Sequence, residues 1–313
     1  MKKVFIDGRA GTTGLRIYER LSQREEIELI ILSEEDRKNP EKRKEALNAA
    51  DAAFLCLPDD AAREAVAMVE NPNTVILDAS TAHRTAAGWS YGFPELGDDF
   101  MQGVCNGKRI AVPGCHASGF VALVYPLVKA GILPKEALLS AFSLTGYSGG
   151  GKKMIGEYEA VERPEALDAP RIYGVTQKHK HLPEMTKICG LDITPVFSPI
   201  VADYYSGMLV TVPLHASQIN GTLADVHNVY KNLYKGPMVN YVEGFEEDGF
   251  LAGNAMSGWD NMEVTVLGND ERFTLAARFD NLGKGASGAA IECMNLSFGL
   301  EMTRGLNVKG ENK

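Results

Sequence analysis

The N-terminal residues place a glycine-rich turn between an apolar run and a helical pattern. Residues 3–7 form the apolar run, and apolar side chains recur at helical spacing over residues 15–21. Small residues at a strand-to-helix turn admit a pyrophosphate, and the helix N-terminus favours its negative charge. The spacing is G-x-x-G-x-x-G where G-x-G-x-x-G is commoner, but the order strand, turn, helix predicts a dinucleotide site. The expected phosphate contacts are Gly8, Gly11, Thr12, Thr13 and Gly14.

Apolar runs and helical patterns continue to alternate along the chain. Residues 28–32, 52–57 and 74–77 are runs of strand length, and residues 61–69 have helical spacing with Asp60 as the expected N-cap. This alternation predicts an α/β fold with a doubly wound parallel (Rossmann) sheet.

A doubly wound sheet binds its ligand beyond the carboxyl ends of its strands. We therefore expect Leu57, Pro58 and Ser80, which lie at or just after the ends of two predicted strands, to contact the cofactor. Cys56 lies inside an apolar run and is expected to be an inert core residue.

The segment after the second predicted strand bears on the choice of cofactor. An acidic residue there binds the ribose 2′-hydroxyl of NAD, whereas a basic residue accommodates the 2′-phosphate of NADP. Ser33 comes first, residues 34–36 are acidic, and Arg37 and Lys38 follow. This order favours NADP, with Ser33, Arg37 and Lys38 around the 2′-phosphate.

Residues 111–119, Ala-Val-Pro-Gly-Cys-His-Ala-Ser-Gly, join a short apolar run to the densely apolar helical segment 120–129. Cys115 is thus predicted at a helix N-terminus, where N–H groups without intrahelical partners and the helix dipole stabilise a thiolate. The alternative is a small buried cysteine that only packs. Pro-Gly before Cys115 and Ser-Gly after it are poor core sequence, which favours a nucleophile.

The pattern changes after residue 129. Strand-like runs at 135–145, 192–201, 208–214, 261–267 and 272–278 predict a second, α+β domain with a mixed or antiparallel sheet. Ser148 and Gly149, in a Ser/Gly-rich loop at 148–153, are expected substrate contacts. A helical pattern from 289 to 296 is expected to return to the first domain. The expected boundaries are 1–116 plus 285–313 for dinucleotide binding and 117–284 for catalysis and dimerisation.

The segment Lys178-His179-Lys180-His181-Leu182-Pro183-Glu184 holds two histidines just before a helix whose first turn contains Pro183. A solvated basic loop is one interpretation, and a metal site is disfavoured because no third His or Cys lies nearby. A base for Cys115 is the sharper hypothesis, since a thiol nucleophile needs an imidazole to take and return a proton and Glu184 could orient that ring.

Composition excludes several classes of protein. The 313 residues carry a formal net charge of -9 and no basic cluster free of acidic neighbours, which argues against a nucleic-acid partner. No apolar run reaches the ~18 residues of a membrane span, and the N-terminus has no signal-peptide pattern. Five cysteines without regular spacing fit reduced thiols, so a cytoplasmic location is expected. The expected partner is a small-molecule substrate, with neither nucleic acid nor membrane.

Several of these stretches together carry a resemblance to a known family. They include residues 4–14, 54–65, the Tyr91-Gly92-Phe93-Pro94-Glu95-Leu96 segment, Pro113-Gly114-Cys115, the His-x-His-x-Pro-Glu element and residues 280–288. The sequence resembles the N-acetyl-gamma-glutamyl-phosphate reductases of arginine biosynthesis, in their shorter form. It is more distantly similar to aspartate-semialdehyde dehydrogenases. His116 departs from the longer members, which carry Tyr-Pro after the nucleophile.

The resemblance implies an NADPH-dependent reductase that works through a thioester on Cys115. It implies that one of His179 and His181 is the acid/base and the other a substrate contact, and that Arg84 holds the substrate phosphate. The alternative for Arg84 is a structural pairing with a nearby acid such as Glu95. Asn281 and Lys284 would contact the cofactor near its nicotinamide, and the protein would be a homo-oligomer, either a dimer or a tetramer. Alternatives are an aspartate-semialdehyde or amino-adipate-type dehydrogenase and a non-catalytic NADP-sensing protein.

Overall fold

A computed structural model describes residues 1–245 and 247–310 of the chain. The chain divides into two compact units. The first contains Met1–Gly114 and Ala286–Leu306, and the second contains the described residues of Cys115–Gly285 and residues 307–310. Within the described ranges, no helix is both long enough and apolar enough to cross a membrane.

The first unit is built on a parallel sheet with the strand order β2-β1-β3-β4-β6-β5. Its strands are β1 (Lys2–Asp7), β2 (Ile27–Ile30), β3 (Ala52–Leu55), β4 (Val75–Asp78), β5 (Ser90–Tyr91) and β6 (Arg109–Ala111). From β1 the chain adds β2 on one side and then crosses to add β3 on the other. The predicted doubly wound sheet is confirmed, and its switch point lies between β1 and β3.

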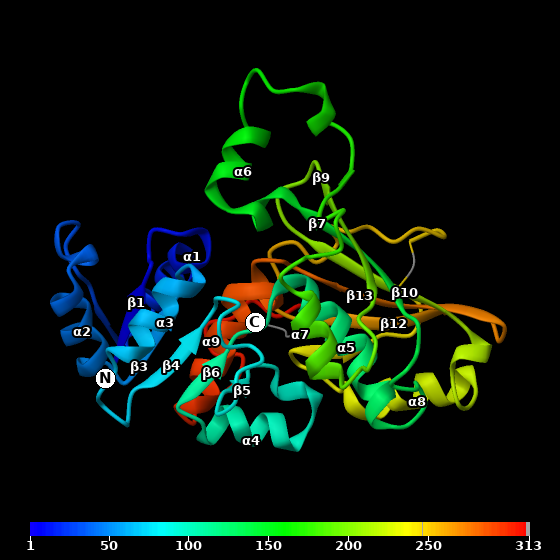
Figure 1. Ribbon diagram of the computed structural model, residues 1–313, viewed down its shortest axis with the longest axis horizontal. Helices are drawn as coiled ribbons and strands as arrows, with labels where there is room; N and C mark the ends of the chain where they lie inside the picture. The colour runs from blue at the N-terminus through cyan, green and yellow to red at the C-terminus, as the bar shows by residue number, and fades with distance from the viewer. Residues whose placement is uncertain (246, 311–313) are drawn as a thin grey trace. The chain divides into compact units, whose positions relative to one another are not determined.

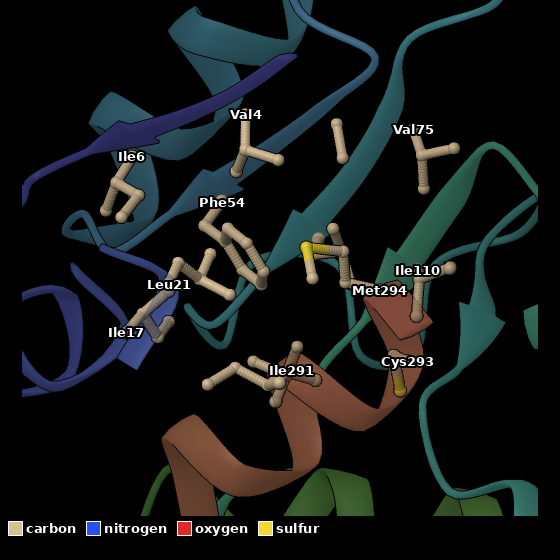
Figure 2. Close-up of a cluster of buried hydrophobic side chains, with 14 of the residues drawn as sticks. Val4, Ile6, Ile17, Leu21, Phe54, Val75, Ile110, Ile291, Cys293 and Met294 are labelled. Carbon is tan, nitrogen blue, oxygen red and sulfur yellow. The ribbon is translucent and has the colours of Figure 1, made fainter. Parts of the chain in front are cut away.

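Helices cover both faces of this sheet (Figure 1). α1 (Thr12–Leu21) and α9 (Gly288–Ser297) pack on one face, and α2 (Pro40–Ala49) and α3 (Asp59–Ala67) on the other. α4 (Asp98–Asn106) packs against α9. Figure 2 shows Leu21 of α1 and Met294 of α9 directed at Phe54 and Val75 in the centre of the sheet. Burial of these side chains at facing positions holds α9, from the far end of the sequence, onto this sheet.

The start of α3 differs from the expectation. Pro58 is its N-cap, the helix begins at Asp59, and no side chain caps it, so the prediction of Asp60 as the cap is wrong. Proline has no N–H to contribute and its fixed φ suits entry into a helix. The helix therefore begins at Asp59 and not at Ala61. Asp60 instead pairs with Arg63 one turn later. Asp59 accepts hydrogen bonds from the amide and the hydroxyl of Thr81.

The second unit contains a mixed sheet with the order β11-β12-β13-β10-β7-β9-β8, as predicted for an α+β domain. β11 with β12 and β7 with β9 pair in parallel, and the other neighbours pair antiparallel. The strands are β7 (Ser140–Gly146), β8 (Arg171–Ile172), β9 (Val196–Ala202), β10 (Met208–His215), β11 (Val239–Tyr241), β12 (Met262–Gly268) and β13 (Arg272–Phe279). β7 and β9 start later than the predicted runs at 135–145 and 192–201.

One face of this sheet is covered by α5 (Cys115–Lys129), which also packs against α7 (Leu182–Cys189) and α8 (Leu223–Leu233) (Figure 1). Pro126 lies inside α5 and has no N–H for the carbonyl of Ala122. The hydroxyl of Tyr234 donates to that carbonyl at 2.7 Å, and the hydroxyl of Tyr230 donates to Leu123. These bonds satisfy the backbone around the proline and let the helix that starts at Cys115 stay buried.

The Ser/Gly-rich segment predicted as a loop is partly helical. Tyr147–Gly150 forms a 3₁₀ turn, and α6 (Gly151–Tyr158) follows it. Glycine disfavours helix in isolation, but the rings of Tyr147 and Tyr158 stack at 4.7 Å and close the segment on itself. This tertiary contact overrides the local preference of the glycines.

The face of the sheet opposite α5 carries exposed apolar side chains. Phe142 of β7 is 42% exposed and Val196 of β9 is 56% exposed. Their strands pair in parallel with Ser140 opposite Val196 and Phe142 opposite Ser198, so both side chains lie on the same face. We call the surface made by Phe142, Leu144, Val196 and Ile200 the outer face.

Candidate functional site

The glycine loop after β1 is packed backbone against backbone. Gly8 has a φ of +84°, and a Cβ on it would lie 2.2 Å from the carbonyl oxygen of Cys56. A Cβ on Gly14 would lie 2.6 Å from the carbonyl oxygen of Gly8. No larger residue fits at either position without moving the main chain. Gly11 is the N-cap of α1, so the amides of Thr12, Thr13 and Gly14 open the helix.

A pocket of about 650 Å³ lies beside this loop within the first unit. Four cationic side chains line it, and two acidic ones. The cations are Arg9, Arg37, Lys38 and Arg43, and the acids are Asp7 and Glu34. The lining is therefore net positive although the chain is net negative. Thr12 Oγ1 is buried and has no hydrogen-bond partner within residues 1–245 and 247–310, which leaves it available to a phosphate. The loop, the charge and the size of the pocket fit a dinucleotide.

The side chains expected around a 2′-phosphate have partners of their own. The Ser33 hydroxyl donates to the Asp36 carboxylate at 3.0 Å, and Nε of Arg37 lies 2.7 Å from Glu34. Both pairs are exposed. Glu34, Arg37 and Lys38 line the pocket, and Ser33 lies outside its lining. Exposed pairs of this kind are weak and exchange readily for a phosphate partner.

Sequence reasoning missed Arg43. Its Nε and Nη2 donate to Oδ2 of Asp7 at 3.0 and 2.8 Å, at the carboxyl end of β1. Burial raises the pKa of Asp7, and the hydrogen bond and charge of Arg43 oppose that rise. The pair joins residues 36 positions apart, so local spacing gives no signal for it.

Leu57 lines the pocket, and the next residue, Pro58, occupies the N-cap position of α3. The Ser80 hydroxyl donates to the buried carboxylate of Asp78 at 2.8 Å, and Nδ1 of His83 lies 2.6 Å from the same carboxylate. The His83 ring stacks on Trp89 at 4.1 Å. These contacts fix the segment that follows β4.

Arg84 belongs to this fixed segment. Its Nε donates to the carbonyl of Val112 and its Nη2 to the carbonyl of Ala79, both at 3.0 Å. Val112 lies three residues before Cys115 in the sequence. The guanidinium is thus held between the ends of two strands of the first unit.

In the second unit, Cys115 is the first residue of α5, as the sequence predicts. The thiol is partly exposed. A Cβ on Gly285 would lie 3.0 Å from Cβ of Cys115, so only glycine leaves that side of the cysteine open. Cys56, by contrast, has its pKa raised to about 12 by burial and by the nearby Asp78 and Asp7 charges, so it stays a neutral thiol.

Three imidazoles gather around the residue after Cys115. The ring of His116, the following residue, has its centre 5.5 Å from that of His179 and 5.7 Å from that of His181. The rings of His179 and His181 are 4.8 Å apart. His181 is the buried N-cap residue of α7, and Glu184 is buried in its first turn. Within the parts of the chain that the structure describes, no group of His, Cys, Asp and Glu has the arrangement of a metal site.

The state of His179 follows from its contacts. Its Nδ1 accepts a hydrogen bond from the amide of His181 at 3.2 Å. Burial and the charge of Lys180 lower the pKa of His179 to about 4, so the ring is neutral at pH 7. A neutral ring with Nδ1 accepting carries its proton on Nε2 and can donate from there.

His116 was not among the candidate residues, although it is central to this cluster. Its Nδ1 lies 2.7 Å from the hydroxyl of Ser143, and its Nε2 lies 2.5 Å from the hydroxyl of Tyr173. Burial, followed by the charges of His179 and Lys180, lowers the pKa of His116 to about 3. The feature of the sequence that could have identified His116 is its position directly after Cys115.

The second unit contains four further candidate residues, namely Ser148, Gly149, Asn281 and Lys284. Asn281 Nδ2 donates to the Ser148 hydroxyl at 2.9 Å, and Asn281 Oδ1 accepts from the amide of Gly207. A Cβ on Gly149 would be 3.5 Å from Asn281 Nδ2. Lys284 is buried in the π-helical turn Gly283–Ser287. The structure therefore brings Ser148, Gly149 and Asn281 together.

Two family models match the chain. Residues 3–103 match the model described as semialdehyde dehydrogenase, NAD binding domain, and residues 115–281 match semialdehyde dehydrogenase, dimerisation domain. Each match falls within one of the two units of the structure.

Similar proteins were found by sequence and by structure. The N-acetyl-gamma-glutamyl-phosphate reductase 2 of Nostoc sp. is 43% identical over 97% of this chain and 99% of its own. The N-acetyl-gamma-glutamyl-phosphate reductase of Brucella anthropi is 45% identical over 95% of this chain and 98% of its own. Among solved structures, aspartate semialdehyde dehydrogenase II of Vibrio cholerae has a TM-score of 0.70 at 16% identity and covers 95% of this chain and 98% of its own. The last similarity concerns the fold alone.

Proposed function

The chain belongs to the semialdehyde dehydrogenase family, and on that premise we propose that it reduces N-acetyl-gamma-glutamyl phosphate to N-acetyl-glutamate semialdehyde and phosphate, a step of arginine biosynthesis. The curated relatives named for this reaction supply the substrate. The observation that carries the chemistry is Cys115, a thiol at the start of a buried helix whose next residue, His116, belongs to a cluster of three imidazoles. A thiol so placed suits acyl transfer.

The proposed reaction begins with Cys115. Its thiolate attacks the acyl carbon, the bond from that carbon to the phosphate oxygen breaks, and phosphate leaves with its electron pair. A thioester then joins the acyl group to Sγ. The nicotinamide cofactor, when bound, supplies a hydride to this group. Collapse of the resulting thiohemiacetal breaks the carbon–sulfur bond and returns Cys115 as the leaving thiolate, while the hydroxyl proton of the thiohemiacetal passes to a base.

We assign the proton transfers to His181 and a substrate contact to His179. His179 already uses Nδ1 as an acceptor and keeps its proton on Nε2, so it is suited to donate a hydrogen bond to substrate. His181 is left as the ring that exchanges a proton with Cys115, with Glu184 in the adjacent helical turn to orient it.

We propose that Arg84 binds the substrate phosphate. Its planar group suits a phosphate because two N–H donors can bind two oxygens at once. The carbonyls of Ala79 and Val112 hold the guanidinium in one orientation, which reduces the entropy lost on binding. We propose Ser148 and Gly149 as further substrate contacts.

The chain uses a nicotinamide cofactor, and we propose that it is NADP. The glycine loop with Thr12 and Thr13 would hold the pyrophosphate, and Leu57, Pro58 and Ser80 would lie near the cofactor. Ser33, Arg37 and Lys38 would surround the 2′-phosphate, which the net positive pocket lining favours. Asn281 and Lys284 would contact the nicotinamide half.

We further propose that the protein is a homo-oligomer in the cytoplasm. The outer face exposes apolar side chains in the unit that matches a dimerisation domain, and a second copy would cover them. All five cysteines are free, the state that a reducing compartment maintains.

The test is phosphate-dependent reduction of the oxidised cofactor, measured in parallel with N-acetyl-glutamate semialdehyde and with aspartate semialdehyde. The proposal expects turnover of the first and little of the second. Preference for aspartate semialdehyde would instead indicate an aspartate-semialdehyde dehydrogenase. Cofactor binding without turnover of either, and with Cys115 unreactive toward an alkylating reagent at neutral pH, would indicate an NADP-sensing protein.

A further inference from the structure

A chain of three polar side chains runs from the sheet of the second unit to Tyr173. Ser143 lies on β7, His116 is the second residue of α5, and Tyr173 follows β8. The Ser143 hydroxyl lies 2.7 Å from Nδ1 of His116, and Nε2 of His116 lies 2.5 Å from the Tyr173 hydroxyl. Ser143 and His116 are both buried, so neither can exchange its partner for bulk water.

The His116 imidazole carries a single proton at neutral pH, because its pKa is lowered to about 3. Two arrangements are then possible. Either Nδ1–H donates to Ser143 and Nε2 accepts the Tyr173 proton, or the Ser143 hydroxyl donates to Nδ1 and Nε2–H donates to the Tyr173 oxygen. The two arrangements differ in which group keeps a proton for another partner.

Ser143 decides between them. His116 is the only hydrogen-bond partner of its hydroxyl among the residues that the structure describes. If Ser143 accepted from Nδ1, its own O–H would be buried without an acceptor, which is unfavourable. Donation from Ser143 to Nδ1 satisfies that hydroxyl. This places the imidazole proton on Nε2, where it donates to Tyr173.

With its oxygen accepting from His116, Tyr173 keeps its own O–H for a further acceptor. Tyr173 lies near Cys115, since its hydroxyl is 2.5 Å from Nε2 of His116, the residue after Cys115. In keeping with this position, the charge of Cys115 adds to burial in raising the pKa of the phenol. The phenol therefore stays protonated at neutral pH. A reaction at Cys115 would create one such acceptor, the oxygen of the bound acyl group.

We propose that Tyr173 is a further catalytic residue, which donates a hydrogen bond to the acyl oxygen while Cys115 holds the acyl group, and that His116 and Ser143 position its proton. The inference rests on the proposed thioester chemistry. The bond strengthens as negative charge gathers on that oxygen in the tetrahedral states and weakens as they collapse. No proton is consumed, so the overall reaction is unchanged.

The inference is tested with Tyr173→Phe, Ser143→Ala and Ser143→Thr, with Ser198→Ala on the neighbouring strand as the matched control. Tyr173→Phe is expected to lower kcat by about 10²- to 10³-fold, as loss of one oxyanion donor does, with little change in KM or in the alkylation rate of Cys115. Ser143→Ala should lower kcat in the same direction, because Nε2 is then free to accept the Tyr173 proton. Ser143→Thr, which keeps the hydroxyl, should recover activity, and Ser198→Ala should not change it.

A readout independent of turnover is the tautomer of His116, from nitrogen chemical shifts of the ¹⁵N-labelled chain. The inference expects protonated Nε2 and accepting Nδ1 in the wild type and loss of this preference in Ser143→Ala. Protonated Nδ1 in the wild type, or wild-type kcat in Tyr173→Phe, would overturn it. Absence of acyl-phosphate reduction by the wild type would instead refute the proposed function.

Discussion

The Tyr173 hydroxyl lies 2.5 Å from Nε2 of His116, the residue that follows Cys115 in the sequence. The first turn of α5 therefore presents the thiol and also anchors a phenol from a segment far along the chain. Any movement of that turn displaces both groups together. The reactivity of Cys115 and the placement of Tyr173 are coupled through two adjacent residues.

Burial of neutral His116 predicts a pH dependence of stability. Its pKa is about 3 in the folded protein and near 6.5 in the unfolded chain, so the unfolded chain binds more protons between these values. The free energy of unfolding therefore falls as the pH is lowered from about 6.5 toward 3, at up to about 1.4 kcal/mol per pH unit from this group.

Urea unfolding at a series of pH values measures this effect. His116→Gln should show a shallower loss of stability than the wild type over this range, and His215→Gln, at an exposed position, should follow the wild type. If the free energy of unfolding depended on pH in the same way for the wild type and for His116→Gln, the imidazole would be protonated as easily in the folded protein as in the unfolded chain.

Variants of the other two histidines of the cluster, His179 and His181, should have different kinetic effects. His181→Asn removes the proposed base, so thioester formation should slow and the pH profile of kcat should change. His179→Asn should mainly raise KM for the acyl phosphate, because the lost group is a neutral donor. Single-turnover kinetics of phosphate release measure the first, and steady-state KM the second. The opposite pattern would exchange the two roles.

Cofactor preference should depend on the rim of the pocket in the first unit. Replacing Arg37 and Lys38 together by Ala should raise KM for NADPH by about tenfold or more and change KM for NADH little, because only NADPH carries the 2′-phosphate. Arg63→Ala, which removes an exposed arginine paired with Asp60, is the matched control. Equal increases for both cofactors would remove these residues from the 2′-phosphate site.

Assembly should depend on the outer face of the second sheet. Phe142→Arg with Val196→Arg places two charges where a second copy is proposed to pack, so the molar mass in light scattering should fall toward that of one chain. Val161→Arg, at a fully exposed apolar position of the same unit, should leave the mass unchanged. An unchanged mass for the double variant would place the interface elsewhere.

The features that the sequence predicted well are contiguous ones. The glycine loop, the strand before it and α1 are adjacent in the chain, and Cys115 at the start of α5 is marked by its immediate neighbours. Alternation of short apolar runs with helical patterns was enough to predict the parallel sheet, because burial on both faces leaves a continuous apolar signature in each strand.

The features it missed depend on contacts across the fold. Arg43 reaches Asp7 over 36 positions, and His116 reaches Tyr173 over 57. No local period encodes either pair. α6 was missed for the opposite reason: its glycines are unfavourable locally, and a stack of two tyrosines stabilises the helix.

The central claim is a thioester on Cys115, and the most direct measurement supplies N-acetyl-gamma-glutamyl phosphate without reduced cofactor. The account predicts release of about one phosphate per chain and an acyl adduct that peptide mass spectrometry maps to Cys115. Cys115→Ser should give neither, because a serine hydroxyl is far harder to deprotonate than a thiol at neutral pH. Stoichiometric phosphate release from Cys115→Ser, or an adduct on another residue of the wild type, would contradict the mechanism.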